Sequence, residues 1–65
     1  MIELKRAQDL RISVVNNEII QCYMKDIAGG FDLDPVKIRG SRVIDGNHRA
    51  AAYKRLGILI PTITE

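Results

Sequence analysis

The segment Asp45–Arg49 places a carboxylate, a glycine, an amide, an imidazole and a guanidinium in consecutive positions. It lies between a predicted strand and a predicted helix, and such a tight turn leaves the first N–H groups of the helix unpaired. These N–H groups and the positive end of the helix dipole favour an anion. Gly46 permits close approach of a phosphate, and Arg49 can add a bidentate contact. The segment therefore predicts a phosphate-binding turn formed by Gly46, Asn47, His48 and Arg49.

Asp45 and His48 are the candidates for catalysis at this turn. Near a helix N-terminus, His48 serves better as a neutral donor or a base than as a fixed cation. The Asp45 carboxylate would repel a phosphate bound to the same N–H groups, and a divalent cation between them would remove the conflict. Mg²⁺ bridges carboxylate and phosphate oxygens, so Asp45 is the predicted metal ligand.

The same residues have simpler structural interpretations. Asp45 is a preferred type of helix N-cap, which contributes about 1 kcal/mol. Arg49 lies four residues later and can pair with Asp45 across the first helical turn. A lone histidine followed by an arginine is more often structural than catalytic. The sequence alone leaves these alternatives open.

Two helices are predicted to support this turn. Ser13 is expected to cap the first helix, which ends at Gly29-Gly30. Its apolar stripe consists of Val15, Ile19, Ile20, Tyr23, Met24 and Ile27. The second helix is predicted to run from Asn47 to Leu56 and to end at Gly57. Its inward-facing residues are predicted to be Arg49, Ala52, Tyr53 and Leu56.

Short apolar runs predict the strands. Residues 2–12 are compatible with a short strand followed by a helical turn. Residues 36–38 and 42–44 are rich in β-branched side chains and flank a glycine turn, which indicates a hairpin. Residues 58–64, interrupted by Pro61, predict a last strand at a sheet edge. This order predicts a single α+β (α/β-like) domain with a small mixed sheet and two main helices.

Basic residues concentrate in the second half of the chain. Between Lys37 and Arg55 the sequence has six basic residues and one acid, whereas the net charge of the whole chain is only +2. Such a bias attracts phosphate or nucleic acid, although a solvated basic face is the simpler explanation. The candidates for contacts with nucleic acid are Arg39, Arg42, Lys54 and Arg55.

At 65 residues, the chain is short for an independently stable domain. A homodimer or a protein partner would supply additional burial. The single cysteine, Cys22, excludes an internal disulfide. No apolar run is long enough to span a membrane, and the N-terminal residues do not resemble a signal peptide. We therefore expect no membrane partner and a cytoplasmic location.

The segment Val43–Gly57 resembles the phosphate-binding box of the ParB/sulfiredoxin superfamily. Its core reads Asp-Gly-Asn-His-Arg, and the preceding helix, the strand around Val36 and the closing strand around Ile63 agree with that superfamily. The resemblance extends from Leu10 to Thr64 and implies a minimal ParB/sulfiredoxin-like core. It also implies that Gly46, Asn47, His48 and Arg49 hold the phosphates of a nucleotide, which is CTP in ParB proteins and ATP in sulfiredoxins.

The resemblance also sets limits on the activity. In sulfiredoxins, the position of Asn47 is occupied by the catalytic cysteine. The resemblance therefore implies that this chain is not a sulfinic-acid reductase. ParB proteins have two arginines where this chain has His48 and Arg49. The His-Arg version is closer to sulfiredoxins and to phage- or plasmid-borne ParB-like proteins, some of which are described as nucleases. The helix-turn-helix and dimerisation domains of partitioning ParB proteins have no counterpart in these 65 residues.

Three functions are consistent with these observations. The first is a binding module for the phosphate of a nucleotide or a nucleic acid, of the phage, plasmid or chromosome-partition type. The second is a Mg²⁺-dependent phosphohydrolase or nuclease, in which Asp45 binds the cation, His48 acts as base or donor and Arg49 stabilises developing charge. The third is a small non-catalytic interaction factor. Binding is favoured, because only one carboxylate lies in the box.

Overall fold

The computed structural model describes residues 1–13 and 16–65. Its elements follow one another as β1 (Glu3–Lys5), a 3₁₀ turn (Ala7–Asp9), α1 (Asn17–Ala28), β2 (Val36–Arg39), β3 (Arg42–Asp45), α2 (Asn47–Leu56) and β4 (Ile60–Thr64). This succession confirms the predicted order of strand, helix, hairpin, helix and strand. Neither of these two helices combines the length and the apolar character that crossing a membrane requires.

The four strands form one mixed sheet in the order β1-β4-β2-β3. The β1–β4 and β2–β3 pairs are antiparallel, and the central β2–β4 pair is parallel. The prediction that the last strand lies at an edge is therefore wrong. Pro61 is tolerated inside the sheet because it is paired only with Leu4 of β1, whereas pairing with β2 begins at Thr62. The proline, which has no N–H group, therefore does not have to donate a hydrogen bond to β2.

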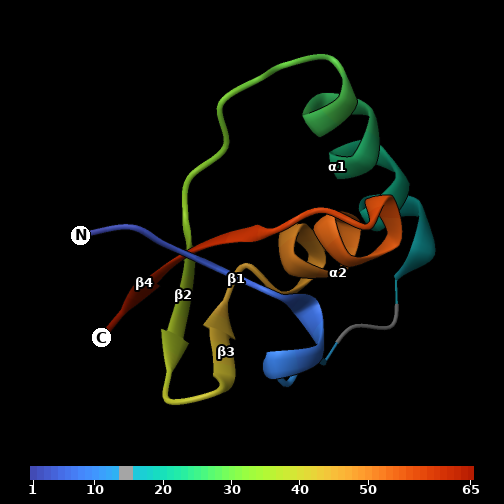
Figure 1. The fold of residues 1–65 in the computed structure, drawn as a ribbon. Coiled ribbons are helices and arrows are strands. Elements are labelled where there is room, and N and C mark those ends of the chain that lie inside the picture. The colour runs from blue at the N-terminus through green and yellow to red at the C-terminus, as the bar shows by residue number, and fades with distance from the viewer. Residues whose placement is uncertain (14–15) are drawn as a thin grey trace.

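Helix α2 lies between the sheet and α1 (Figure 1). Ala50 and Tyr53 belong to the core cluster that includes Val36, Ile38 and Ile60 of the sheet. Ala51 and Ala52 instead pack with Ile20 of α1. Because α2 is covered on two sides, the run Ala50–Tyr53 is buried as a whole.

The predicted inward stripe of α2 is therefore only half correct. Ala52 and Tyr53 are buried, as expected, but Arg49 and Leu56 are only half-buried. Ala50 and Ala51, which the prediction left out, are buried. A stripe at spacings of three and four describes a helix with one covered face, whereas this helix has two neighbouring covered faces.

Helix α1 begins later than predicted. Its N-cap is Asn16, whose Oδ1 accepts a hydrogen bond from the N–H of Ile19 at 3.2 Å. Ser13 does not cap the helix, and its N–H donates instead to Oδ1 of Asn47, the first residue of α2. Within the predicted stripe, Ile20 is buried but Ile19 is exposed, and Val15 lies outside the described residues.

The two edges of the sheet differ. At the β3 edge, the N–H of Arg11 donates to the Ser41 carbonyl at 2.7 Å, and the N–H of Val43 donates to the Arg11 carbonyl at 3.1 Å. Arg11 thereby forms a parallel bridge with Arg42 and covers β3. Strand β1 forms the other edge of the sheet and, among the described strands, pairs with β4 alone.

Candidate functional site

Gly46 alone connects β3 to α2. It adopts a left-handed conformation with φ 88° and ψ 30°, which a residue without a Cβ atom reaches at little cost. Its carbonyl accepts the first helical hydrogen bond, from the N–H of Ala50 at 2.8 Å. Among the residues that the structure describes, the N–H groups of Asn47, His48 and Arg49 have no hydrogen-bond acceptor. The turn therefore presents free donors at the positive end of the α2 dipole.

The Arg49 guanidinium folds back over this turn. A Cβ atom built on Gly46 would lie only 2.7 Å from Nη2, 3.1 Å from Cζ and 3.2 Å from Nε of Arg49. The space that the missing side chain leaves is thus filled by the guanidinium. Arg49 Nε is buried and has no hydrogen-bond partner within residues 1–13 and 16–65, and the same is true of His48 Nε2. Unpaired buried polar atoms are uncommon, and these two belong to consecutive residues of the first turn of α2, where a water molecule, an ion or a ligand can supply the partner.

The Asn47 side chain is already engaged within the protein. Its Oδ1 accepts a hydrogen bond from the N–H of Ser13 at 3.0 Å, and its Nδ2 donates to the Val43 carbonyl at 3.5 Å. The amide thereby connects the N-terminal segment, strand β3 and the start of α2. Among the described residues, the backbone N–H of Asn47 and the second hydrogen of its Nδ2 remain free for the predicted phosphate contact. No local signal in the sequence indicates this role of the side chain, because Ser13 lies 34 positions away.

We expect Asn47→Ala to destabilise the fold. The substitution leaves the Ser13 N–H and the Val43 carbonyl without the amide, and the loss of two hydrogen bonds costs about 1–3 kcal/mol of unfolding free energy. Chemical denaturation followed by circular dichroism measures this loss. Asn17→Ala is the matched control, because the Asn17 side chain is exposed and its partner Arg55 is exposed as well. Equal effects of the two substitutions would contradict the bridging role of Asn47.

Asp45 plays neither of the structural roles that the sequence suggested. It is the last residue of β3 and is exposed, and the N-cap position of α2 is occupied by Gly46 without a side-chain cap. Within the described residues, no ion pair joins Asp45 to Arg49. Gly46 separates Asp45 from the helix, so the carboxylate belongs to the strand, where it is paired in register with Lys37.

The predicted metal site has a sparse set of ligands. The described residues contain no group of three or more His, Cys, Asp or Glu side chains placed to hold a metal ion. The Asp45 carboxylate could therefore hold Mg²⁺ only together with oxygen atoms that do not come from His, Cys, Asp or Glu side chains of the described residues. Phosphate oxygens and water fulfil that requirement, because Mg²⁺ at nucleotide sites commonly takes one or two carboxylates and completes its shell from these sources.

The four basic residues predicted to contact nucleic acid are not gathered around the turn. Arg39 and Arg42 lie directly opposite each other at the hairpin end of β2 and β3, and both are exposed. That end is roughly 13 Å from Gly46 along β3. Lys54 and Arg55 lie in the last turn of α2, roughly 10 Å along the helix from its start. Arg55 is further tied to α1 by a hydrogen bond from Nη2 to the Asn17 Oδ1.

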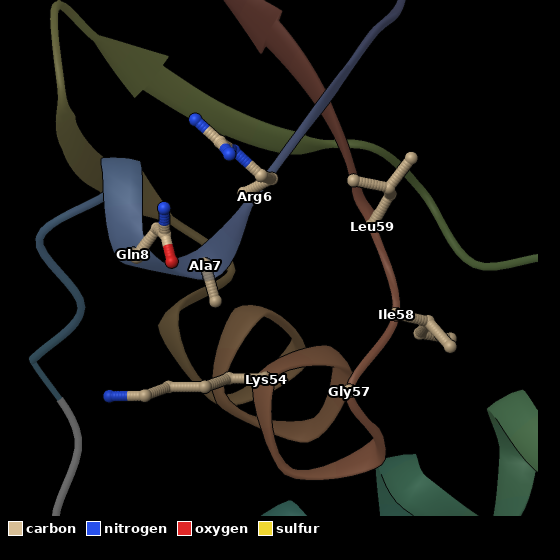
Figure 2. Close-up of a pocket in the computed structure, with 7 residues that line it drawn as sticks. All are labelled: Arg6, Ala7, Gln8, Lys54, Gly57, Ile58 and Leu59. Carbon is tan, nitrogen blue, oxygen red and sulfur yellow. The ribbon is translucent and has the colours of Figure 1, made fainter.

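Two surface pockets lie away from the Asp45–Arg49 turn. One, of about 370 Å³, is lined by Arg6, Ala7, Gln8, Lys54, Gly57, Ile58 and Leu59 (Figure 2). The other, of about 330 Å³, is lined by Ile12, Ala51, Lys54 and Arg55. Residues 45–49 line neither pocket. Residues 46–49 of the turn are half-buried and offer backbone donors at the start of α2, which suits a small charged group.

Comparison with solved structures identifies the fold. No protein-family model and no curated protein matches the chain. The crystal structure of sulfiredoxin from Arabidopsis thaliana superposes with a TM-score of 0.80, over 100% of this chain and 84% of the sulfiredoxin chain, at 19% sequence identity. The chain has the sulfiredoxin fold. At this identity the likeness establishes the α+β architecture with its four-stranded mixed sheet and two helices, and it confirms the predicted fold class.

Proposed function

We propose that the turn Asp45–Arg49 binds a phosphate group, and that this phosphate belongs to a nucleotide such as CTP or ATP. The observation that carries the proposal is the pair of buried, unpartnered nitrogens, Arg49 Nε and His48 Nε2, at the start of α2. A phosphate at Gly46 would accept hydrogen bonds from the free helix N–H groups and from the guanidinium. The sulfiredoxin fold and the Asp-Gly-Asn-His-Arg segment support a ParB/sulfiredoxin-like domain of the phage, plasmid or chromosome-partition type.

Asp45 is proposed to act with Mg²⁺ on the bound phosphate. The carboxylate is exposed at the end of β3, one residue before the turn, and is therefore accessible to a cation held by phosphate oxygens. Binding is a better-supported function than hydrolysis. A Mg²⁺-dependent phosphohydrolase or nuclease usually needs further carboxylates, and the described residues supply no such cluster.

Nucleic acid is a second candidate ligand, supported by the hairpin. Arg39 and Arg42 are cross-strand partners, and like charges directly opposite each other destabilise a sheet. Neither arginine takes part in an ion pair within the described residues. A phosphodiester placed between them would relieve this repulsion. Such binding should weaken steeply with salt and on Arg42→Ala, and an affinity that does not change with salt would contradict it.

The test of the phosphate site is a titration of inorganic phosphate, CTP and ATP, each with and without Mg²⁺, followed by amide chemical shifts. We expect the largest shifts at Gly46, Asn47, His48 and Arg49. Arg49→Ala should weaken binding about 10- to 100-fold, the effect of losing one charged hydrogen-bonding group. Arg39→Ala removes the same charge at the far end of the hairpin and should leave the nucleotide affinity nearly unchanged.

Two outcomes would contradict the proposal. The first is an absence of shifts at residues 46–49 at millimolar ligand. The second is an equal loss of affinity in Arg49→Ala and Arg39→Ala, which would indicate a general charge effect. Release of inorganic phosphate from bound CTP or ATP, lost in both His48→Ala and Asp45→Ala, would favour the enzyme over the binding module.

A further inference from the structure

The outer edge of β1 is open, whereas the opposite edge of the sheet is covered. At the β3 edge, Arg11 exchanges two backbone hydrogen bonds with the hairpin. Strand β1 pairs with β4 on one side, and no described strand lies on its other side. An open edge presents unpaired N–H and C=O groups that pair readily with another strand. The edge of β1 is therefore the place where this sheet can be extended.

The residues of β1 are complementary to themselves. Glu3 and Lys5 lie on one face of the strand and form an ion pair at 3.3 Å between Oε2 and Nζ. Leu4 lies on the other face, opposite Pro61 of β4, and its side chain is 63% exposed. In an antiparallel pair of two such strands centred on Leu4, each Glu3 lies opposite a Lys5. Both cross-strand charge pairs are then attractive, and the two leucines meet.

We propose that two copies of this chain associate through β1, antiparallel and about a two-fold axis at Leu4, so that their sheets join into one. A two-fold axis makes the interface isologous, since the same residues are used twice. The two intramolecular Glu3–Lys5 pairs become a square of alternating charges. Every member of this square has two partners of opposite sign.

Exposed apolar side chains gather around this edge. Ile2 is 58% exposed and lies on the same face of β1 as Leu4. In the proposed register, the partner's Ile2 lies opposite Arg6, at the end of β1 where the pocket of about 370 Å³ opens. Leu59 and Ile58, which are 48% and 46% exposed, line that pocket together with Arg6 (Figure 2). Pairing thus places the partner's Ile2 beside Arg6, next to an exposed and partly apolar surface.

A three-residue strand buries little area, so this dimer is expected to be weak and reversible. Charge pattern, rather than apolar area alone, argues for a second copy as the partner. An arbitrary strand would add backbone hydrogen bonds to the edge. Glu3 needs a base directly opposite it on the neighbouring strand, and Lys5 needs an acid. An antiparallel copy of β1 places its own Lys5 opposite Glu3 and its own Glu3 opposite Lys5.

The test uses charge reversal and measures mass by sedimentation over a wide range of protein concentration. The unmodified chain should move from the mass of one chain towards that of two as its concentration rises. Glu3→Lys and Lys5→Glu each place like charges opposite each other, so each variant alone should remain monomeric. An equimolar mixture of the two variants restores both attractive pairs and should form a heterodimer.

The controls are Glu18→Lys and Lys25→Glu, which make the same changes at exposed positions of α1. Both should dimerise like the unmodified chain. Circular dichroism of each variant checks that the fold is retained. Three results would overturn the proposal: a chain that stays monomeric at millimolar concentration, β1 variants that dimerise like the unmodified chain, or a mixture that behaves like its separate components.

Discussion

Gly46→Ala should nearly abolish phosphate binding. A Cβ atom at this position would meet Arg49 Nη2 at 2.7 Å, which is closer than such atoms approach, so the flexible end of the Arg49 side chain has to shift relative to the turn. The added methyl group would also occupy the surface that a phosphate approaches. Displacing the arginine alone costs about 1.5–3 kcal/mol of binding free energy, or roughly 10- to 100-fold in affinity, and blocking the backbone donors adds to this loss.

Gly46→Ala should also lower the stability of the fold, and this effect has to be separated from the loss of binding. The φ of 88° costs an alanine about 1–2 kcal/mol. Gly30→Ala is the matched control, because Gly30 has a φ of 82° and no atom within 4 Å of an added Cβ. The control should lose similar stability but retain phosphate affinity, measured by titration calorimetry on both folded variants. Equal affinities of the two variants would contradict the site.

Ile38→Ala should remove a large part of the unfolding free energy of the protein. Ile38 is 1% exposed and lies on β2, inside the sheet, in the core cluster with Val36, Ile60 and Tyr53. Truncating a buried isoleucine to alanine costs about 2–5 kcal/mol, since the substitution removes apolar contacts and leaves a cavity. A domain of this length is stable by roughly 3–10 kcal/mol in total. Urea unfolding followed by circular dichroism measures the loss.

Ile44→Ala is the control for this core substitution. Ile44 lies on the adjacent strand β3, has the same side chain and is 38% exposed. The control variant should lose much less stability than Ile38→Ala, because part of its side chain already contacts water in the folded state. Similar losses for the two isoleucines would mean that the sheet does not bury the face that contacts α2.

Much of the fold was predictable, because its signals are local. The hairpin follows from β-branched runs on both sides of Gly40, and α2 follows from the turn at Gly46 and the left-handed C-cap at Gly57. The α+β class follows from the order of these elements, and the sulfiredoxin-like fold was expected from the resemblance of the Val43–Gly57 segment to the ParB/sulfiredoxin superfamily. In each case neighbouring residues carry the information, since caps and turns depend on backbone conformations within a few positions.

The failed predictions concern contacts between distant parts of the chain. The interior position of β4 depends on its pairing with both β1 and β2, and a strand that contains Pro61 is typical of an edge when considered alone. Ser13 is a good cap by composition, but its N–H group donates to Asn47 and the helix begins after Asn16. The double burial of α2 depends on α1 packing against it.

For the candidate site, the sequence by itself determined the turn, its glycine and the basic and polar residues that follow it. A helix that begins directly after a glycine leaves its first N–H groups without partners inside the helix, and glycine has no side chain that could cap them. Only the tertiary structure decided which side chains remain available. It folds Arg49 over Gly46, engages Asn47 with Ser13 and Val43, and separates Asp45 from the helix cap. The partners of these side chains depend on how segments that are distant in the sequence pack together. A local sequence pattern therefore does not predict them.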